Sequence, residues 1–265
     1  MRKLAAIALP LVALIAAGCS GSGSAATRTA TTPATSQHPA TASPSSPSSA
    51  SPVMTASERL FANGMAASIA DIPDRAVSGP VMHAYIRFEH DYGSADGDVG
   101  QPDASGTLFP VPGGFKVCST GSDASSACSI FTQIRYNRRG QITGLSVDGK
   151  PVAGRIATAP SATSGGLTIS DVASYALSSA QDVVVVTFKL TDSSYRPVNT
   201  SPALLASLSG ASDDTGKDAL PATLEPGDSL YGAAAFDVSG ITGLFCLQPN
   251  DGFGERLPCT TLRLA

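Results

Sequence analysis

The longest apolar run of the chain extends from residue 4 to residue 17 and directly follows two basic residues, Arg2 and Lys3. A helix needs about 20 apolar residues to span a bilayer, so this run is too short for a stable membrane anchor. A short apolar core behind a positive start, followed by small residues, is typical of a signal peptide. We therefore predict that residues 1–18 are a signal peptide that is cleaved and does not belong to the fold.

The residues that end this run predict a lipid anchor. Ala16, Ala17, Gly18 and Cys19 resemble the bacterial lipoprotein box, in which small residues precede a cysteine that becomes the new N-terminus. The resemblance implies a thioether-linked diacylglycerol on Cys19 and acyl chains such as palmitate, enough to hold a protein on a membrane. The chain is then predicted to sit on the extracellular face of the cell membrane. The alternative is an ordinary secretory signal with an incidental cysteine.

Residues 19–57 show neither a helical nor a strand period and consist almost entirely of Ser, Thr, Ala, Pro and Gly. Such a segment cannot bury enough apolar surface to offset the entropy of ordering its backbone. We predict a disordered tether that carries the folded part away from the membrane. Its Ser, Thr and Pro content also permits O-glycosylation.

The next segment, residues 58–160, reads as a small region of one helix and an antiparallel sheet. Apolar residues recur at helical spacing over residues 55–72, where Ser57 can cap the helix and Pro73 ends it. Residues 82–89 alternate between apolar and polar, which predicts a half-buried strand.

A three-strand meander is predicted after it. Its strands are residues 130–136, 141–147 and 151–156, and Asp148 with Gly149 supplies the positive φ angles that a two-residue hairpin turn needs. Residues 157–166 are rich in Ala, Thr, Ser, Pro and Gly and are predicted to be a linker.

Residues 166–265 form the second predicted domain. Short strand patterns separated by turn signals, without a helix, favour a β-sandwich whose two sheets cover each other's apolar faces. The run Val183 to Phe188 is the most apolar and should be the central strand. The fold class is therefore mainly β. The strand candidates are residues 167–170, 175–178, 182–190, 203–208, 220–224 and 229–238, and a hairpin over 241–264.

One part of this domain resembles a known family. After the strand at 183–190 come the turn at 224–229, with Pro226 and Gly227, and the strand at 232–238, in which Phe236 should point inward. This order resembles a family of secreted actinobacterial and Gram-positive lipoproteins with an immunoglobulin-like sandwich, similar to the mycobacterial immunoprotective extracellular antigen. The resemblance implies that fold for residues 166–265 and implies no settled molecular activity.

The five cysteines divide into one lipid attachment site and two pairs. With Cys19 assigned to lipid, Cys118, Cys128, Cys246 and Cys259 remain in an oxidising exterior where disulfides persist. Each of the pairs 118/128 and 246/259 flanks a turn-rich stretch between two predicted strands, so its members should face each other across a hairpin. We predict two structural disulfides. A zinc site or redox pair is the alternative, but the chain has no Cys-x-x-Cys motif and only three His.

The excess of acidic over basic residues limits the classes of molecule that the protein is expected to bind. The 17 basic and 21 acidic residues give a formal net charge of −4. Because Arg2, Lys3 and Arg28 lie before residue 58, the predicted folded part has 14 basic and 21 acidic residues, a net charge of −7. An acidic surface excludes nucleic acid as the expected partner and disfavours anionic lipid or teichoic polymers.

Candidate chemistry is sparse. His83 and His90 have opposite parity on the predicted strand at 82–89 and its continuation, so they should not converge on a metal. The sequence contains no Gly-x-Ser-x-Gly, His-Glu-x-x-His, Walker or Gly-x-Gly-x-x-Gly motif, and we predict neither a catalytic residue nor a cofactor. The charges at 213–214 and at Arg135, Arg138 and Arg139 are interpreted as exposed turn charges.

The one constellation that suggests a ligand is the acidic, Gly-containing stretch from Asp91 to Asp98, with Asp103 after it. Clustered carboxylates on a flexible loop can wrap a calcium ion, although the spacing is not that of an EF-hand. Such a stretch is more often a solvated hairpin connection, and we assign no metal ligand to it. The carboxylates of Asp91 and Asp98 could also serve as an acid/base pair.

These observations favour a cell-surface lipoprotein whose folded part is a non-catalytic module that binds a protein or an envelope component. The alternatives are an envelope hydrolase or transferase that uses carboxylates, and a protein that binds a cation or a small ligand.

Overall fold

The computed structural model describes residues 54–67, 69–98, 106–119, 128–177, 183–195, 197–199, 204–209, 217–219, 223–238, 240–249 and 258–265. All of these residues belong to one compact unit, Pro52–Ala265. The predicted signal peptide, Cys19 and the tether up to residue 53 lie outside the described residues. Among the described residues, no helix is long and apolar enough to cross a membrane.

The first helix, α1 (Ala56–Met65), begins at a capping box. Its N-cap is Thr55, whose hydroxyl accepts from the Glu58 N–H, while the Glu58 carboxylate accepts from the Thr55 N–H. Ser57 therefore lies inside the helix and is not its cap. The helix also ends well before residue 72, because the chain folds back across Gly64, whose carbonyl accepts from the Asp71 N–H. A Cβ at Gly64 would stand 2.5 Å from the Asp71 carbonyl oxygen, so only glycine permits this close return.

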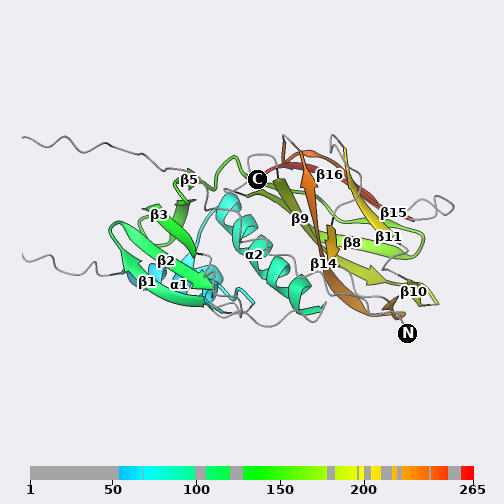
Figure 1. Ribbon diagram of the computed structural model, residues 1–265, viewed down its shortest axis with the longest axis horizontal. Helices are drawn as coiled ribbons and strands as arrows, with labels where there is room; N and C mark the ends of the chain where they lie inside the picture. The colour runs from blue at the N-terminus through cyan, green and yellow to red at the C-terminus, as the bar shows by residue number, and fades with distance from the viewer. Residues whose placement is uncertain are drawn as a thin grey trace, which may run out of the picture. The chain divides into compact units, whose positions relative to one another are not determined.

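The strand predicted at 82–89 is wrong, because these residues form part of the second helix, α2 (Pro80–Asp98). The buried side chains of Met82, Tyr85, Phe88, Asp91 and Ala95 follow one another at intervals of three and four residues, which is helical spacing. The apparent alternation arose because Ala84 and Ile86 are buried too. Figure 1 shows α2 in cyan, and the helix contacts strands of both large sheets. A helix that is packed on more than one side loses the clean apolar stripe that identifies a surface helix.

A short 3-10 helix, η1 (Asp74–Ala76), precedes α2, and a five-stranded antiparallel sheet follows it in the order β1-β2-β3-β4-β5. Phe115 and Phe131 stack at 4.8 Å on one face of this sheet, and Phe61 of α1 packs on both at 6.0 Å. These three rings form the core between α1 and the sheet. The strands are β1 (Gly106–Val111), β2 (Gly114–Ser119), β3 (Cys128–Tyr136), β4 (Ile142–Val147) and β5 (Lys150–Pro151).

In the predicted meander the turn at Asp148 and Gly149 is correct, but the third strand, predicted at 151–156, is wrong. Asp148 and Gly149 have φ angles of 51° and 77°, as the predicted two-residue hairpin requires. However, β5 is only two residues long. Ile156 instead begins β6 (Ile156–Thr158), which pairs with β8 and β16 of the other sheet. The predicted linker at 157–166 is likewise wrong, since it holds the end of β6 and all of β7 (Ala162–Ser164).

The second sheet has nine strands in the order β11-β15-β16-β6-β8-β9-β14-β12, with β7 paired to β8. The antiparallel strands form a barrel-like sandwich, seen at the right of Figure 1. The remaining two strands, β10 (Val198–Asn199) and β13 (Thr223–Leu224), pair only with each other among the described residues. The other strands of the large sheet are β8 (Leu167–Ala176), β9 (Val183–Asp192), β11 (Leu204–Leu208), β12 (Lys217–Ala219), β14 (Ser229–Asp237), β15 (Gly243–Pro249) and β16 (Cys259–Leu264).

The strand β8 contains the strand predicted at 167–170 and the first two residues of the strand predicted at 175–178. A bulge between Ser170 and Ala173 lets one strand change its facing pattern, and Asp171 in this bulge has a φ angle of 53°. The predicted central strand, β9, does lie between β8 and β14. Gly227 has a φ angle of 86° in the turn before β14, and Phe236 points inward as predicted.

Both faces of the β8-β9-β14 part of the sheet are buried. Alternate residues of β9, such as Val186 and Phe188, enter the sandwich core, where Phe188 and Phe236 contact Phe245 of β15. Thr187 faces the opposite side, which α2 covers, and its side chain is also fully buried. This part of the sheet is therefore a middle layer between α2 and the β11-β15-β16 layer.

Both predicted disulfides are present. Cys118 of β2 bonds to Cys128 of β3, and Cys246 of β15 bonds to Cys259 of β16. In each pair the two cysteines are directly opposed in the strand register, with Cα atoms 4.0 and 4.1 Å apart. Each bond therefore locks the register of one hairpin.

Candidate functional site

The acidic stretch considered as a calcium-binding loop or a solvated hairpin connection is helical from Asp91 to Asp98. Asp91, Asp96 and Asp98 all lie in the last two turns of α2, and Asp103 lies outside the described residues. Asp91 and Asp98 are seven residues apart, which on a helix separates them by about 10 Å along the axis, so they cannot close around one ion as a loop does. In the described part of the chain, no group of three or more His, Cys, Asp or Glu side chains could hold a metal ion.

Asp91 is instead a buried carboxyl group with one partner. Its side chain is 4% exposed, and its Oδ1 lies 3.0 Å from Nδ1 of the half-exposed His90. Its Oδ2 is enclosed and has no hydrogen-bond partner among the described residues. Burial raises the pKa of Asp91 to about 6, although the hydrogen bond and the charge of His90 lower it in part.

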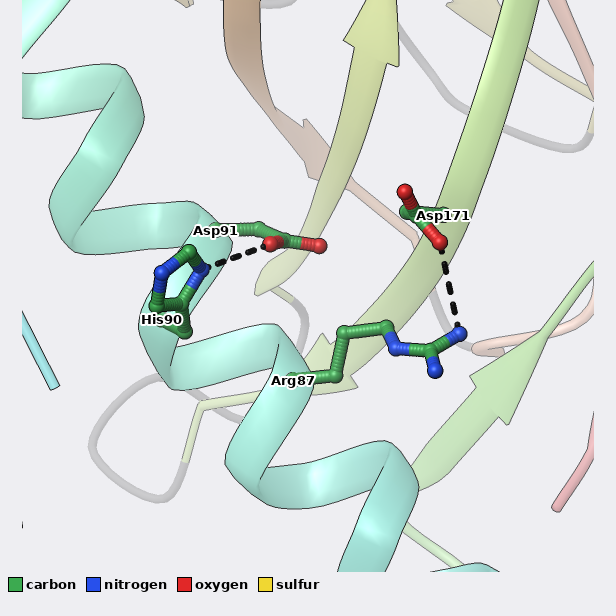
Figure 2. Close-up of polar contacts among 4 residues, drawn as sticks. All are labelled: Arg87, His90, Asp91 and Asp171. Carbon is green, nitrogen blue, oxygen red and sulfur yellow. Dashed lines mark hydrogen bonds and ion pairs between the residues drawn. The ribbon is translucent and has the colours of Figure 1, made fainter. Parts of the chain in front are cut away.

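A second carboxylate comes close to Asp91 from the sheet. Asp171 of the β8 bulge carries an ion pair with Arg87 of α2, with 3.4 Å between Nη1 and Oδ1. The negative charge of Asp171 contributes to the raised pKa of Asp91, and the positive charge of Arg87 opposes it. Figure 2 shows His90 and Arg87 on neighbouring turns of α2, with both carboxylates on the side of the helix that faces β8.

The carboxylate that the structure brings near Asp91 is that of Asp171, whose partner is Arg87. The side chain of Asp98, suggested as a possible acid/base partner of Asp91, lies outside the described residues. Sequence reasoning did not select Asp171 or Arg87. The available signal was the polar pair Ser170-Asp171 between two apolar strand patterns, which is typical of a bulge. Because the unpartnered Oδ2 of Asp91 is enclosed, this cluster offers no open carboxylate pair for acid/base chemistry.

The opposite flank of α2 carries a second polar cluster. The Tyr85 hydroxyl donates a hydrogen bond to the Glu89 carboxylate, and the buried Tyr85 and Tyr175 rings lie 5.3 Å apart. The Arg155 guanidinium lies 4.5 Å from the centre of the Tyr175 ring and also donates to the Ala176 carbonyl. Burial raises the pKa of Glu89 to about 7, and its hydrogen bond with Tyr85 opposes that shift.

The two histidines lie on α2 and not on a strand, so the parity argument that separated them is wrong. Seven residues apart on a helix, they are nearly aligned but about 10 Å apart along the axis. Nδ1 of His83 lies 2.8 Å from the Gly79 carbonyl, and the His90 ring meets the edge of Tyr231 at 5.8 Å. Each imidazole therefore has a separate local contact.

A different surface carries exposed apolar side chains. On the face of the five-stranded sheet opposite Phe115 and Phe131, Phe109 of β1, Lys116 of β2 and Ile130 of β3 lie in one cross-strand row. Phe109 and Ile130 are 43% and 40% exposed, and the Lys116 Nζ lies 5.1 Å from the centre of the Phe109 ring. We call these three residues the open-face row.

The edge of the same sheet is protected. Pro110 lies in the outer strand β1 and cannot donate a backbone hydrogen bond. The Gly106 N–H is occupied by the Ala66 carbonyl at 2.8 Å. Addition of a partner strand along β1 is therefore obstructed at both ends.

The charged residues predicted to be exposed in turns are only partly so placed. Arg138 and Arg139 lie in the exposed turn between β3 and β4, and Arg135 is exposed on β3 with its guanidinium against Gly144. Residues 213–214 lie outside the described residues.

Comparison with protein-family models, with curated proteins and with solved structures finds no match. The resemblance to the actinobacterial lipoprotein family therefore stays a prediction.

Proposed function

We propose that the protein is a lipid-anchored surface protein whose folded part binds another protein through the open-face row, without a catalytic role. The observation that carries this proposal is the exposure of Phe109 and Ile130 in one cross-strand row, with Lys116 between them. Exposed apolar side chains on one face with a charged neighbour are typical of contact sites, where an aromatic anchor fills a pocket on the partner.

The open face has two properties that suit binding. The Cys118–Cys128 disulfide lies in the same strands and on the same face as the row, so the positions of Lys116 and Ile130 are fixed before a partner arrives. A pre-organised surface loses little conformational entropy on association. The complementary surface would present an apolar pocket for Phe109 and an acidic group for Lys116.

A site-specific photocrosslink tests this contact. A benzophenone amino acid is placed at position 109 or, as a control, at the fully exposed Tyr195 in the nine-stranded part of the chain. In living cells we expect one discrete protein adduct from position 109 and none of that mass from position 195. The adduct should disappear when Ile130→Asp is added. An adduct that survives Ile130→Asp, or only a glycan adduct, would overturn the protein-binding proposal.

The anchor requires a separate test because the described residues do not include Cys19. We expect Cys19→Ala to move the chain from the membrane fraction to the medium or wall fraction, and the wild-type chain to carry the mass of acyl chains. A wild-type chain that is already soluble and unacylated would establish the ordinary secretory signal instead.

A further inference from the structure

The helix α2 contacts both large sheets, through β4 of one and through β8, β9 and β14 of the other. It carries two carboxyl groups with raised pKa values, Glu89 and Asp91. Successive residues of a helix are separated by about 100°, so these two side chains leave α2 about 200° apart. The two side chains therefore lie on different sides of the same helix.

On the Asp91 flank, charged and titratable side chains from the helix and from the sheet lie close together. His90 and Arg87 come from α2 itself and Asp171 comes from β8. Lys189 of β9 and Tyr231 of β14 are engaged with each other, with the Lys189 Nζ 5.8 Å from the centre of the Tyr231 ring. Among the described residues none of these groups gives Asp91 Oδ2 a hydrogen bond, and Thr187 Oγ1 on the sheet is also buried without one.

On the Glu89 flank, the neighbours are mostly uncharged. Tyr85 comes from α2, Tyr175 from β8, and Arg155 from the chain just before β6. Arg155 is held against Tyr175 and the Ala176 carbonyl, and its charge is not among the causes that shift the pKa of Glu89. Glu89 itself is partly exposed, and the Tyr85 hydroxyl is its hydrogen-bond donor.

We propose that α2 is a pH-responsive clamp, held against the sheets in mildly acidic surroundings by protonated Glu89 and Asp91 and loosened when these groups ionise towards neutral and alkaline pH. An ionised carboxylate that is buried without a full set of hydrogen bonds is less stable there than in water, whereas its protonated form is not. Opening α2 hydrates both groups.

The sign of the effect follows from proton linkage. Both carboxyl groups bind a proton more tightly when α2 is packed, because their pKa values rise from 3.8 to about 6 and from 4.5 to about 7. The stabilisation is therefore greatest in acid and is lost as the pH rises through these values. Between pH 5 and pH 8 each group should increase the opening constant of α2 by about tenfold or more.

Hydrogen exchange of the full chain measures this opening. After correction for the intrinsic pH dependence of exchange, we expect the amides of α2 to be less protected at pH 8 than at pH 5. The amides of β9, as an internal reference, should change less. Equal or greater protection of α2 at pH 8 would overturn the proposal.

Four variants, one of them a control at an exposed position, identify the titrating groups. Asp91→Asn and Glu89→Gln should each reduce the change in α2 protection between pH 5 and pH 8 by about tenfold. Glu225→Gln, at an exposed position in the turn before β14, should leave it unchanged. His90→Gln removes the side chain whose Nδ1 lies 3.0 Å from Asp91 Oδ1. A pH dependence that vanishes in His90→Gln but persists in both carboxamide variants would assign the effect to His90 and overturn the clamp.

Discussion

The two large sheets differ in how their faces are covered. In the nine-stranded sheet, the β8-β9-β14 part is buried on both sides, by α2 and by the facing layer of β11, β15 and β16. In the five-stranded sheet, α1 covers the face of Phe115 and Phe131, and the opposite face exposes Phe109 and Ile130. Antiparallel sheets tolerate one solvated face, but its outward positions are then usually polar. The open face differs from this pattern because it carries exposed apolar side chains, and a binding partner would explain them.

The strongest test of whether the two sheets are stabilised separately is to remove one buried aromatic ring from each. Phe188 and Phe131 are both fully buried, so Phe188→Ala and Phe131→Ala should each lower the free energy of unfolding by about 3–5 kcal/mol. Denaturant unfolding followed by hydrogen exchange in both regions measures the loss. If both variants shift both regions equally, the unit unfolds as one; if each shifts only its own region, the two sheets are independent.

The disulfides should give the next largest effect. Closing loops of 10 and 13 residues stabilises the fold by about 3 kcal/mol each in the loop-entropy treatment. Replacing Cys246 and Cys259 together by Ser should lower the melting temperature of the nine-stranded sheet, and replacing Cys118 and Cys128 should lower that of the five-stranded sheet. Calorimetry of both double variants checks this. A variant with an unchanged melting temperature would show that its hairpin is held by packing alone.

A smaller effect is expected at the start of α1. Thr55→Ala removes a side-chain cap and should lower the free energy of unfolding by about 1 kcal/mol. Ser57→Ala is the matched control, because Ser57 lies inside the helix, and it should change the stability little. Equal losses from both variants in denaturant titrations would contradict the assignment of the cap.

The smallest effect on stability is expected on the open face. Phe109→Ala and Ile130→Ser should change the free energy of unfolding by no more than about 1 kcal/mol, since both side chains are partly exposed and lie outside the buried core. They should nevertheless abolish the crosslink proposed above. A large loss of stability in either variant would mean that the side chain supports the fold and is not reserved for a partner.

Local patterns were sufficient for much of the fold. The Asp148-Gly149 turn, the central strand β9 and both disulfides follow from residues that are neighbours in sequence or face each other across one hairpin. The main error was α2, because a helix with Ala84 and Ile86 buried beside Tyr85 imitates the alternation of a strand. Gly93 and Gly97 also lower its helix propensity, which tertiary packing overrides.

The candidate site was less accessible to sequence reasoning. Asp91 was selected, but for a loop that does not exist, and its neighbour Asp171 is 80 residues away in the chain and reaches it only because a bulge redirects β8. The open-face row was also missed. Phe109, Lys116 and Ile130 are brought together by strand register, which becomes known only when β1, β2 and β3 are aligned.

The position of β16 in its sheet has a consequence for the timing of biogenesis. Residues 259–264 pair with β15 on one side and with β6, a hundred residues earlier, on the other. The sheet that runs from β11 to β12 therefore lacks the strand that joins β15 to β6 until residue 264 has left the ribosome. The five-stranded sheet, complete by Pro151, has all its strands much earlier. A chain of this topology therefore emerges with its large sheet unformed while the strands of the five-stranded sheet are already present.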